Sequence, residues 1–290
     1  MFKKIVIFGV GLIGGSVALA LKKLPNPPTI IGVGRSNQSL QEALDLGLID
    51  QAETNIANAL GNADLVLIAA PVAQTPAILK SILPHLTANT VITDAGSTKS
   101  DVMAYAKAEL GEHFQQFVGG HPIAGAEKSG PSAATADLYL GKNVILTPAA
   151  VTNNEALEKV ASLWQNCGAL VSNMPPEEHD SVFAAVSHLP HLLAFALVED
   201  LAKRDNAELL FKFAASGFRD FTRIAGSHPE MWRDIALANK QALLQELNIY
   251  QQAVSEMTAL LESNDQEGLF ALFEHASHAR NAWAKSKIQS

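Results

Sequence analysis

The chain begins with short apolar runs separated by stretches in which apolar and small residues mix. Residues 5–8 form an apolar run short enough for a strand that is buried on both faces. Residues 12–23 read as a helix, and residues 29–33 form a second apolar run. This order predicts a β-α-β unit, in which a helix connects two parallel strands.

The same alternation continues to about residue 173. It predicts further strands at residues 65–69, 90–93, 116–118, 144–146 and 170–172, and further helices at residues 38–46, 73–83, 98–110 and 154–164. Alternating strands and helices are typical of a mostly parallel sheet with helices on both faces. We therefore predict an α/β fold with an N-terminal, doubly wound, Rossmann-type parallel sheet.

The pattern changes at Met174-Pro175-Pro176. Beyond this point no strand is predicted, and amphipathic stretches rich in alanine, leucine and phenylalanine follow, most clearly at residues 248–262 and 266–285. We predict a dinucleotide-binding domain over residues 1–173 and an all-helical substrate and dimerisation domain over residues 174–290. Helices this apolar usually bury a face in a partner, so we expect a homodimer through the helical domain.

Composition narrows the class of protein further. A net charge of −8 and a sequence without a lysine/arginine stripe argue against a nucleic-acid partner. No apolar run reaches the ~18 residues of a membrane span, so we expect no membrane partner. Lys3-Lys4 and the apolar run after them mimic a signal peptide, but glycines interrupt that run, and we expect a cytoplasmic protein. The single cysteine, Cys167, excludes an internal disulfide.

Three glycines at the end of the first predicted strand carry the first functional signal. Gly9, Gly11 and Gly14 form G-x-G-x-x-G between a strand and a helix. The first glycine permits a tight turn, the second lets a pyrophosphate approach the backbone, and the third lets helix and strand pack closely. The diphosphate would bind free N–H groups at the positive end of the helix dipole. This context predicts a dinucleotide site rather than an ordinary glycine-rich turn.

Two later strands end in loops with polar residues, where an open α/β sheet delivers side chains to its cofactor crevice. The first loop contains Ser97 and Thr98, either of which could instead be a helix N-cap. The second contains His121 between Gly120 and Pro122. We expect it to lie on an irregular loop just after a strand, where a neutral imidazole can meet a substrate hydroxyl. The ordinary pKa of histidine, about 6.5, suits a general base at neutral pH.

The helical half contributes histidines and arginines at helical spacing. His188 and His191 stand three residues apart, which could suggest a metal pair, but no third ligand is near them in sequence and we expect no metal. Arg219 and Arg223 stand one helical turn apart, a spacing suited to clamping a carboxylate. The alternative is that both are surface arginines paired with acidic residues.

These blocks together resemble the prephenate and arogenate dehydrogenase family, which includes broad-specificity cyclohexadienyl dehydrogenases. The resemblance runs in family order from G-V-G-L-I-G-G-S through D-A-G-S-T-K and H-P-I-A-G-A-E-K-S-G to S-H-L-P-H, F-R-D-F-T-R-I-A and S-H-P-E-M-W-R-D. It covers nearly the whole chain, and it implies an enzyme of tyrosine biosynthesis.

Residue roles follow from this resemblance. His121 would be the catalytic base, and Ser97 would be its partner at the ring hydroxyl of the substrate. Arg223 would bind a substrate carboxylate. The other implied pocket residues are His191, Arg219, Glu127 near the pocket mouth, and Trp232, which is expected to reach the edge of the neighbouring subunit's site.

The implied reaction is an oxidative decarboxylation of a cyclohexadienyl ring, prephenate or arogenate. Hydride passes to a nicotinamide, His121 takes the hydroxyl proton, and carbon dioxide leaves to give 4-hydroxyphenylpyruvate or tyrosine. The ring that becomes aromatic accepts the electrons, which explains why no metal is needed. Ala126 stands where relatives often have a hydroxyl residue, which leaves side-chain discrimination between the two substrates open.

Cofactor choice depends on the end of the second strand. Many dinucleotide sites have an acid there that binds the ribose 2′-hydroxyl, whereas this chain has Gly34-Arg35-Ser36. This sequence favours the 2′-phosphate of NADP, with NAD as the alternative. The residues expected to bind the cofactor are Gly9, Gly11, Leu12, Ile13, Gly14, Gly34, Arg35, Ser36, Ala70 and Pro71.

Two other functions are compatible with parts of the pattern. A β-hydroxyacid dehydrogenase or a pyrroline-carboxylate reductase has the same architecture, but would be expected to place its acid/base group on the helical domain. A non-enzymatic NADP sensor would not need Ser97, His121 and Arg223 together.

Overall fold

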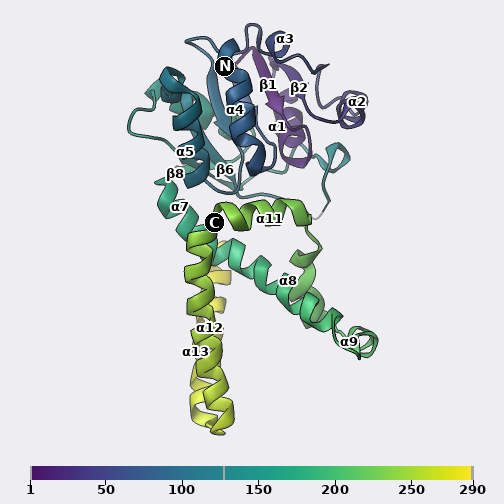
Figure 1. Ribbon diagram of the computed structural model, residues 1–290, viewed down its shortest axis with the longest axis vertical. Helices are drawn as coiled ribbons and strands as arrows, with labels where there is room; N and C mark the ends of the chain where they lie inside the picture. The colour runs from purple at the N-terminus through teal and green to yellow at the C-terminus, as the bar shows by residue number, and fades with distance from the viewer. Residues whose placement is uncertain (1, 127, 289–290) are drawn as a thin grey trace. The chain divides into compact units, whose positions relative to one another are not determined.

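The structure is a computed structural model that describes residues 2–126 and 128–288. In these residues, an eight-stranded sheet has the order β3-β2-β1-β4-β5-β6-β7-β8. Figure 1 shows strands β1, β2 and β6 of this sheet among helices α1, α4 and α5. The strands are β1 (Lys4–Phe8), β2 (Thr29–Val33), β3 (Gln51–Glu53), β4 (Leu65–Ile68), β5 (Val91–Asp94), β6 (Phe117–Pro122), β7 (Asn143–Thr147) and β8 (Leu170–Asn173). Neighbouring strands are parallel except β6 and β7. The predicted doubly wound, mostly parallel sheet is therefore confirmed.

The sheet has a hydrophobic core on each face. Successive side chains of a strand point to opposite faces, so Ile5 and Ile7 of β1 join one core while Val6 and Phe8 join the other. The first core packs against α1 (Leu12–Lys22), α2 (Asn37–Asp45) and α6 (Asn154–Asn166), and the second against α3 (Ile56–Leu60), α4 (Thr75–Ile82) and α5 (Ser100–Glu109). Burial on both faces explains why these strands are continuous apolar runs.

Two short elements were not predicted. Strand β3 has only three residues, two of them exposed, and α3 has only five. An edge strand this short shows neither an apolar run nor a clear alternation. It forms because Gln51–Glu53 pair with β2, which is a tertiary effect.

The structure corrects the expected setting of His121, which lies within β6 and not on a loop after it. Strand β6 is longer than predicted because it pairs with antiparallel β7, where His121 lies opposite Ile145. Two glycines permit the close approach of β6 to its neighbours, Gly119 towards β7 and Gly120 towards β5. A Cβ atom at Gly119 would lie 2.4 Å from the hydroxyl of Thr147, and one at Gly120 would lie 2.7 Å from the carbonyl oxygen of Asp94.

The chain beyond β8 is helical, as predicted. It continues with α7 (Pro176–Phe183), the π-helical turn η5 (Ala184–His188), α8 (Leu189–Ala202), α9 (Ala207–Lys212), α10 (Ser216–Thr222), the 3-10 turn η6 (Arg223–Gly226) and α11 (Pro229–Ala238). Helix α11 contacts the 3-10 turn η1 (Val72–Gln74), which follows β4. The helical segment thus meets the carboxyl end of the sheet.

Helices α7 and α8 and the turn between them form one continuous helix of 27 residues. Its most apolar window has a mean hydropathy of 1.7, so by length and composition alone it could cross a membrane. The sequence showed no apolar run of that length, because polar residues interrupt it. Among these, His179, Asp180 and His188 are buried in the structure, which favours a helix packed within the protein.

By contacts the chain divides into two compact units, residues 1–242 and residues 243–290. The predicted boundary near residue 173 lies between β8 and α7, inside the first unit. The second unit contains most of α12 (Lys240–Glu262) and all of α13 (Gln266–Ile288), which are joined by a tight turn. In that turn Asn264 has a φ of 51°, and Asp265 accepts a hydrogen bond from the backbone of Gly268 at 2.9 Å.

The glycine-rich turn after β1 gives a test of why each glycine is present. A Cβ atom at Gly14 would lie 2.3 Å from the carbonyl oxygen of Gly9, whereas one at Gly11 would have nothing within 4 Å. We expect Gly14→Ala to lower the free energy of unfolding by about 1–3 kcal/mol, the usual cost of overpacking. Gly11→Ala should fold normally but bind dinucleotide more weakly. Denaturant unfolding and dinucleotide titration of both variants measure this, and equal stability losses would contradict it.

Candidate active site

His121 is the first member of a chain of three buried side chains. Its Nδ1 lies 2.8 Å from Nε2 of His179, and Nδ1 of His179 lies 2.8 Å from Oδ1 of Asp180. The exposed fractions of His121, His179 and Asp180 are 9%, 0% and 5%. Strand β6 supplies the first residue and α7 the other two, so the group forms only where the helical segment meets the sheet. The sequence did not predict His179 or Asp180 as site residues.

Burial and charge keep His121 and His179 neutral. Burial, helped by the nearby positive charge of Lys99, lowers the pKa of His121 well below its ordinary value and also lowers the pKa of His179. Burial alone would raise the pKa of Asp180, but hydrogen bonds from His179 and from backbone N–H groups outweigh it and lower that pKa. Asp180 is therefore ionised beside two neutral imidazoles.

The carboxylate of Asp180 also caps helix α5. Its Oδ1 accepts a hydrogen bond from the backbone N–H of Lys99, and its Oδ2 accepts one from that of Ser100, both at 2.8 Å. The N-cap position of α5 is Lys99, which has no side-chain cap of its own. Neither Ser97 nor Thr98 is therefore the N-cap of α5, which was the alternative to a role in the site. A negative charge at this end of a helix is favoured by the helix dipole.

A buried ion pair between Lys99 and Asp94 holds the loop that contains Ser97 in place. The ammonium of Lys99 binds the carboxylate of Asp94 and donates to the carbonyl oxygen of Gly120 at 2.8 Å. Asp94 in turn accepts from the backbone N–H of Gly96 at 2.8 Å and of Gly120 at 2.9 Å. The Lys99–Asp94 pair thus holds both the loop after β5 and Gly120, the residue before His121.

His188 connects this group with a second one. It is 1% exposed, and its Nδ1 lies 3.1 Å from the amide nitrogen of Asn239, which also donates to the backbone oxygen of Asp180 at 2.8 Å. Burial lowers the pKa of His188 to about 4, and the backbone of Ser97 opposes this shift. The π-helical turn that carries His188 is a feature often found at functional sites.

The second group contains three of the predicted pocket residues. The rings of His191 and Trp232 stack at 3.7 Å between centroids, although they come from α8 and α11 of the same chain. Nδ1 of His191 donates to the carbonyl oxygen of Ser187 at 2.9 Å. Burial and the nearby positive charge of Arg223 lower the pKa of His191. Arg223 therefore lies close to the stacked pair.

Two other predicted pocket residues are not part of this group. Arg219 has a side chain that is 77% exposed, and its Nε lies 3.4 Å from Oδ1 of Asp220. This is the surface pairing that was the alternative for it. Glu127 lies outside the described residues.

The predicted dinucleotide loop follows β1 at the carboxyl edge of the sheet. Gly9 has a φ of 92°, and a Cβ atom there would lie 2.6 Å from the backbone oxygen of Ala69. Gly11 is the N-cap of α1 and provides no side-chain cap, so the N–H groups that begin α1 are not capped by that residue. Leu12 and Ile13 are the first residues of the helix, and the predicted contacts Ala70 and Pro71 follow β4. The open space at Gly11 fits a bound diphosphate.

The end of β2 has the predicted Gly34-Arg35-Ser36 sequence on the surface. Arg35 is exposed, and the hydroxyl oxygen of Ser36 accepts a hydrogen bond from the backbone of Ser39 at 3.2 Å as the cap of α2. A Cβ atom at Gly34 would lie 3.4 Å from Leu40, an ordinary van der Waals distance, so a side chain can be accommodated there.

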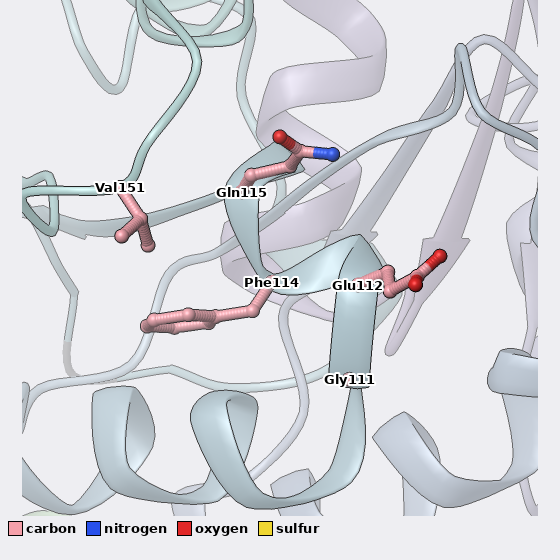
Figure 2. A pocket seen from close by; sticks show the side chains of 5 residues that line it. All are labelled: Gly111, Glu112, Phe114, Gln115 and Val151. Carbon is pink, nitrogen blue, oxygen red and sulfur yellow. The ribbon is translucent and has the colours of Figure 1, made fainter.

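A hollow of about 340 Å³ elsewhere on the surface contains none of these residues. It is lined by Gly111, Glu112, Phe114, Gln115 and Val151. Figure 2 shows the ring of Phe114 on the same side as Val151, while Glu112 points away from both. The 3-10 turn η3 (Gly111–Gln116) precedes β6, so the hollow lies at the start of that strand and His121 near its end. It brings no group of chemical interest together.

Known sequences resemble this chain over both of its predicted halves. Residues 17–173 match the nucleotide-binding domain of prephenate dehydrogenase, and residues 175–275 match the prephenate dehydrogenase dimerization domain. Prephenate dehydrogenase of Bacillus subtilis is 41% identical over 96% of this chain and 75% of the relative. Cyclohexadienyl dehydrogenase of Zymomonas mobilis is 34% identical over 97% of this chain and 96% of the relative.

Solved structures resemble it in the same way. Prephenate dehydrogenase from A. aeolicus, in complex with hydroxyphenyl propionate and NAD+, has a TM-score of 0.91 and 38% identity over 97% of this chain and 98% of that one. Arogenate dehydrogenase from Synechocystis has a TM-score of 0.80 and 29% identity over 97% and 99% of the two chains.

The neutral, buried His188 predicts a loss of stability in mild acid. Its pKa is about 4 in the folded protein and 6.5 in the unfolded chain. The unfolded state therefore binds a proton first, and stability that is present above pH 6.5 is lost as the pH falls towards 4. His188→Gln should reduce the loss between pH 7 and pH 5 by about 2 kcal/mol. Denaturant unfolding of both proteins at equal concentration measures this, and the same loss in both would contradict it.

Proposed function

The chain belongs to the prephenate dehydrogenase family, and on that basis we propose that it oxidises and decarboxylates prephenate to 4-hydroxyphenylpyruvate with a nicotinamide cofactor. This is a step of tyrosine biosynthesis. The observation that carries the proposal is His121, a neutral imidazole held at the carboxyl end of the sheet by His179. Family membership favours this reaction over a β-hydroxyacid dehydrogenase, a pyrroline-carboxylate reductase or an NADP sensor.

His121 would act as the base at the ring hydroxyl. The nicotinamide cofactor that the glycine loop would hold would supply the acceptor for the hydride on the carbon that bears this hydroxyl. His121 takes the hydroxyl proton as the carbon–oxygen double bond forms. The carbon–carbon bond to the ring carboxylate then breaks, and its electrons enter the ring, which becomes aromatic. The proton on His121 returns to the phenolate oxygen, so protons and electrons balance. Ser97, on the loop that Lys99 and Asp94 fix, would orient the hydroxyl.

The second group would bind the rest of the substrate. Arg223 offers a planar guanidinium that pairs with a carboxylate through two bonds, and its charge already reaches His191. The stack of His191 on Trp232 gives a flat wall of the kind that packs against a ring. Arg219, which is exposed and paired with Asp220, has no direct contact with the substrate in this proposal. Prephenate is the favoured substrate, because its dehydrogenase from Bacillus subtilis shares 41% identity with this chain.

The cofactor would bind at the glycine loop, with its diphosphate at the N–H groups of α1 and its adenosine ribose near the end of β2. Gly11 leaves the backbone accessible there, while Gly9 and Gly14 permit the tight turn and the close packing of α1 on β1. We propose a preference for NADP over NAD, because Gly34 places no carboxylate near the 2′-phosphate. The exposed guanidinium of Arg35 and the hydroxyl of Ser36 could both contact that phosphate.

The enzyme would work as a homodimer formed by the helical half. Residues 175–275 match a dimerization domain. Large apolar side chains are exposed on α12 and α13 in the isolated chain: Leu244, Ile249, Tyr250, Val254, Leu261, Phe270, Phe273 and Trp283. Apolar surface of this extent usually marks an interface.

Replacing the base tests the proposed reaction. We expect the wild-type enzyme to reduce the nicotinamide with prephenate, and His121→Asn to lower kcat by about 10²- to 10⁴-fold, the range for losing general acid–base catalysis. Cofactor affinity should change little. His85→Asn, which replaces an exposed histidine, is the control. Steady-state assays with prephenate and with arogenate measure this. No turnover of either substrate by the wild type would refute the reaction, and nearly full kcat in the variant would remove His121 from it.

Cofactor preference is tested at the end of β2. Arg35→Ala should weaken NADP binding by roughly tenfold or more, about 1.4 kcal/mol, and leave NAD almost unaffected. Gly34→Asp should shift preference towards NAD, because a carboxylate repels the phosphate. Arg204→Ala removes another exposed arginine as a control. Titration with both cofactors measures these effects, and a wild-type enzyme that uses NAD better than NADP would overturn the proposal.

A further inference from the structure

The hydrogen bonds behind His121 determine which of its ring nitrogens carries the proton. An ionised carboxylate only accepts hydrogen bonds, so Asp180 requires the proton of His179 to lie on Nδ1, 2.8 Å away. Neutral His179 then has a lone pair on Nε2. That lone pair faces Nδ1 of His121 at 2.8 Å, and a hydrogen bond between the two exists only if Nδ1 of His121 carries a proton.

We propose that His179 and Asp180 are positioning residues that hold His121 in the tautomer with its proton on Nδ1, so that Nε2 is the basic nitrogen. This inference rests on the proposed function, in which His121 is the base. The tautomer matters because a histidine with its proton on Nε2 would present a donor to the substrate hydroxyl and could not accept the proton.

His179 and Asp180 also stabilise His121 after it has accepted the proton. The imidazolium has protons on both nitrogens, and its Nδ1–H still donates to His179. Asp180, at the far end, places a negative charge two hydrogen bonds away. His179 takes no proton itself in this scheme. The positive charge of Lys99 opposes this protonation, and the carboxylate of Asp94 that pairs with Lys99 offsets part of that effect.

Packing leaves the rings of His121 and His179 little freedom to reorient. The ring of Phe183 lies 5.0 Å from that of His121 and 4.5 Å from that of His179, between centroids. Asp180 is held separately by the backbone N–H groups of Lys99 and Ser100. Its carboxylate therefore keeps its place whether or not His179 is present.

The test uses His179 and not Asp180, because replacing Asp180 would also remove the cap of α5. His179→Leu removes the acceptor for Nδ1–H, and we expect kcat with prephenate to fall by about 10- to 100-fold, the range known for losing the hydrogen-bond partner that orients a metal-binding histidine. His179→Gln is the matched variant. Its amide oxygen can accept the same hydrogen bond, so it should recover most of the lost activity.

A spectroscopic measurement decides the tautomer without any substrate. In protein with ¹⁵N-labelled histidine, His121 is assigned by the signals that His121→Asn removes. We expect neutral His121 to be protonated on Nδ1 in the wild type and in His179→Gln, and to lose this preference in His179→Leu. A wild-type His121 protonated on Nε2 would overturn the proposal, as would full kcat in His179→Leu. If wild-type enzyme does not turn over prephenate, the proposed function fails, while the tautomer is still decided by the spectrum.

Discussion

The buried carboxylate of Asp180 is the interaction on which the site depends. It binds the start of α5 through two backbone N–H groups and binds His179 through its side chain. One charge thus joins the helical segment to the sheet and orients the histidines between them. A buried charge is tolerated only when it is paired or fully hydrogen-bonded, and removing one partner of such a group typically costs about 3–5 kcal/mol. The arrangement of α7 against α5 and the chemistry of His121 are therefore set together.

A second buried charge pair gives the sheet edge its shape. Lys99 is fully buried, and its ammonium is shared between Asp94 at the end of β5 and the backbone of Gly120 in β6. Because Asp94 also accepts from Gly96 and Gly120, it fixes the loop of Ser97 and the residue before His121 at the same time. The positive charge of Lys99 also helps to keep His121 neutral. The Lys99–Asp94 pair thus holds the backbone in place, and its lysine also lowers the pKa of His121.

Much of this fold could be predicted from the sequence because strands buried on both faces must be apolar throughout. The exceptions, β3 and α3, are too short to show a period, and β6 is longer than its apolar run because of its pairing with β7. For the site, the sequence proposed His121 as the base, and the family resemblance placed His191, Arg223 and Trp232 in one pocket. The structure brings these last three close together. His179 and Asp180 were missed because their partners are far away in sequence. His179 stands 58 residues from His121, and Asp180 stands 81 residues from Lys99. Only the packing of α7 on the sheet reveals them, and in the sequence they resemble any polar residues at the start of a helix.

The central claim is that His121 is a neutral base whose burial and neighbours lower its pKa well below 6.5. The most direct test is the pH dependence of kcat/KM for prephenate at saturating cofactor, which reports the ionisation of the enzyme before substrate binds. The account predicts that activity stays level as the pH falls through 6.5 and declines only at distinctly lower pH. An acidic limb centred at or above 6.5, absent from any variant that replaces His121, would contradict it.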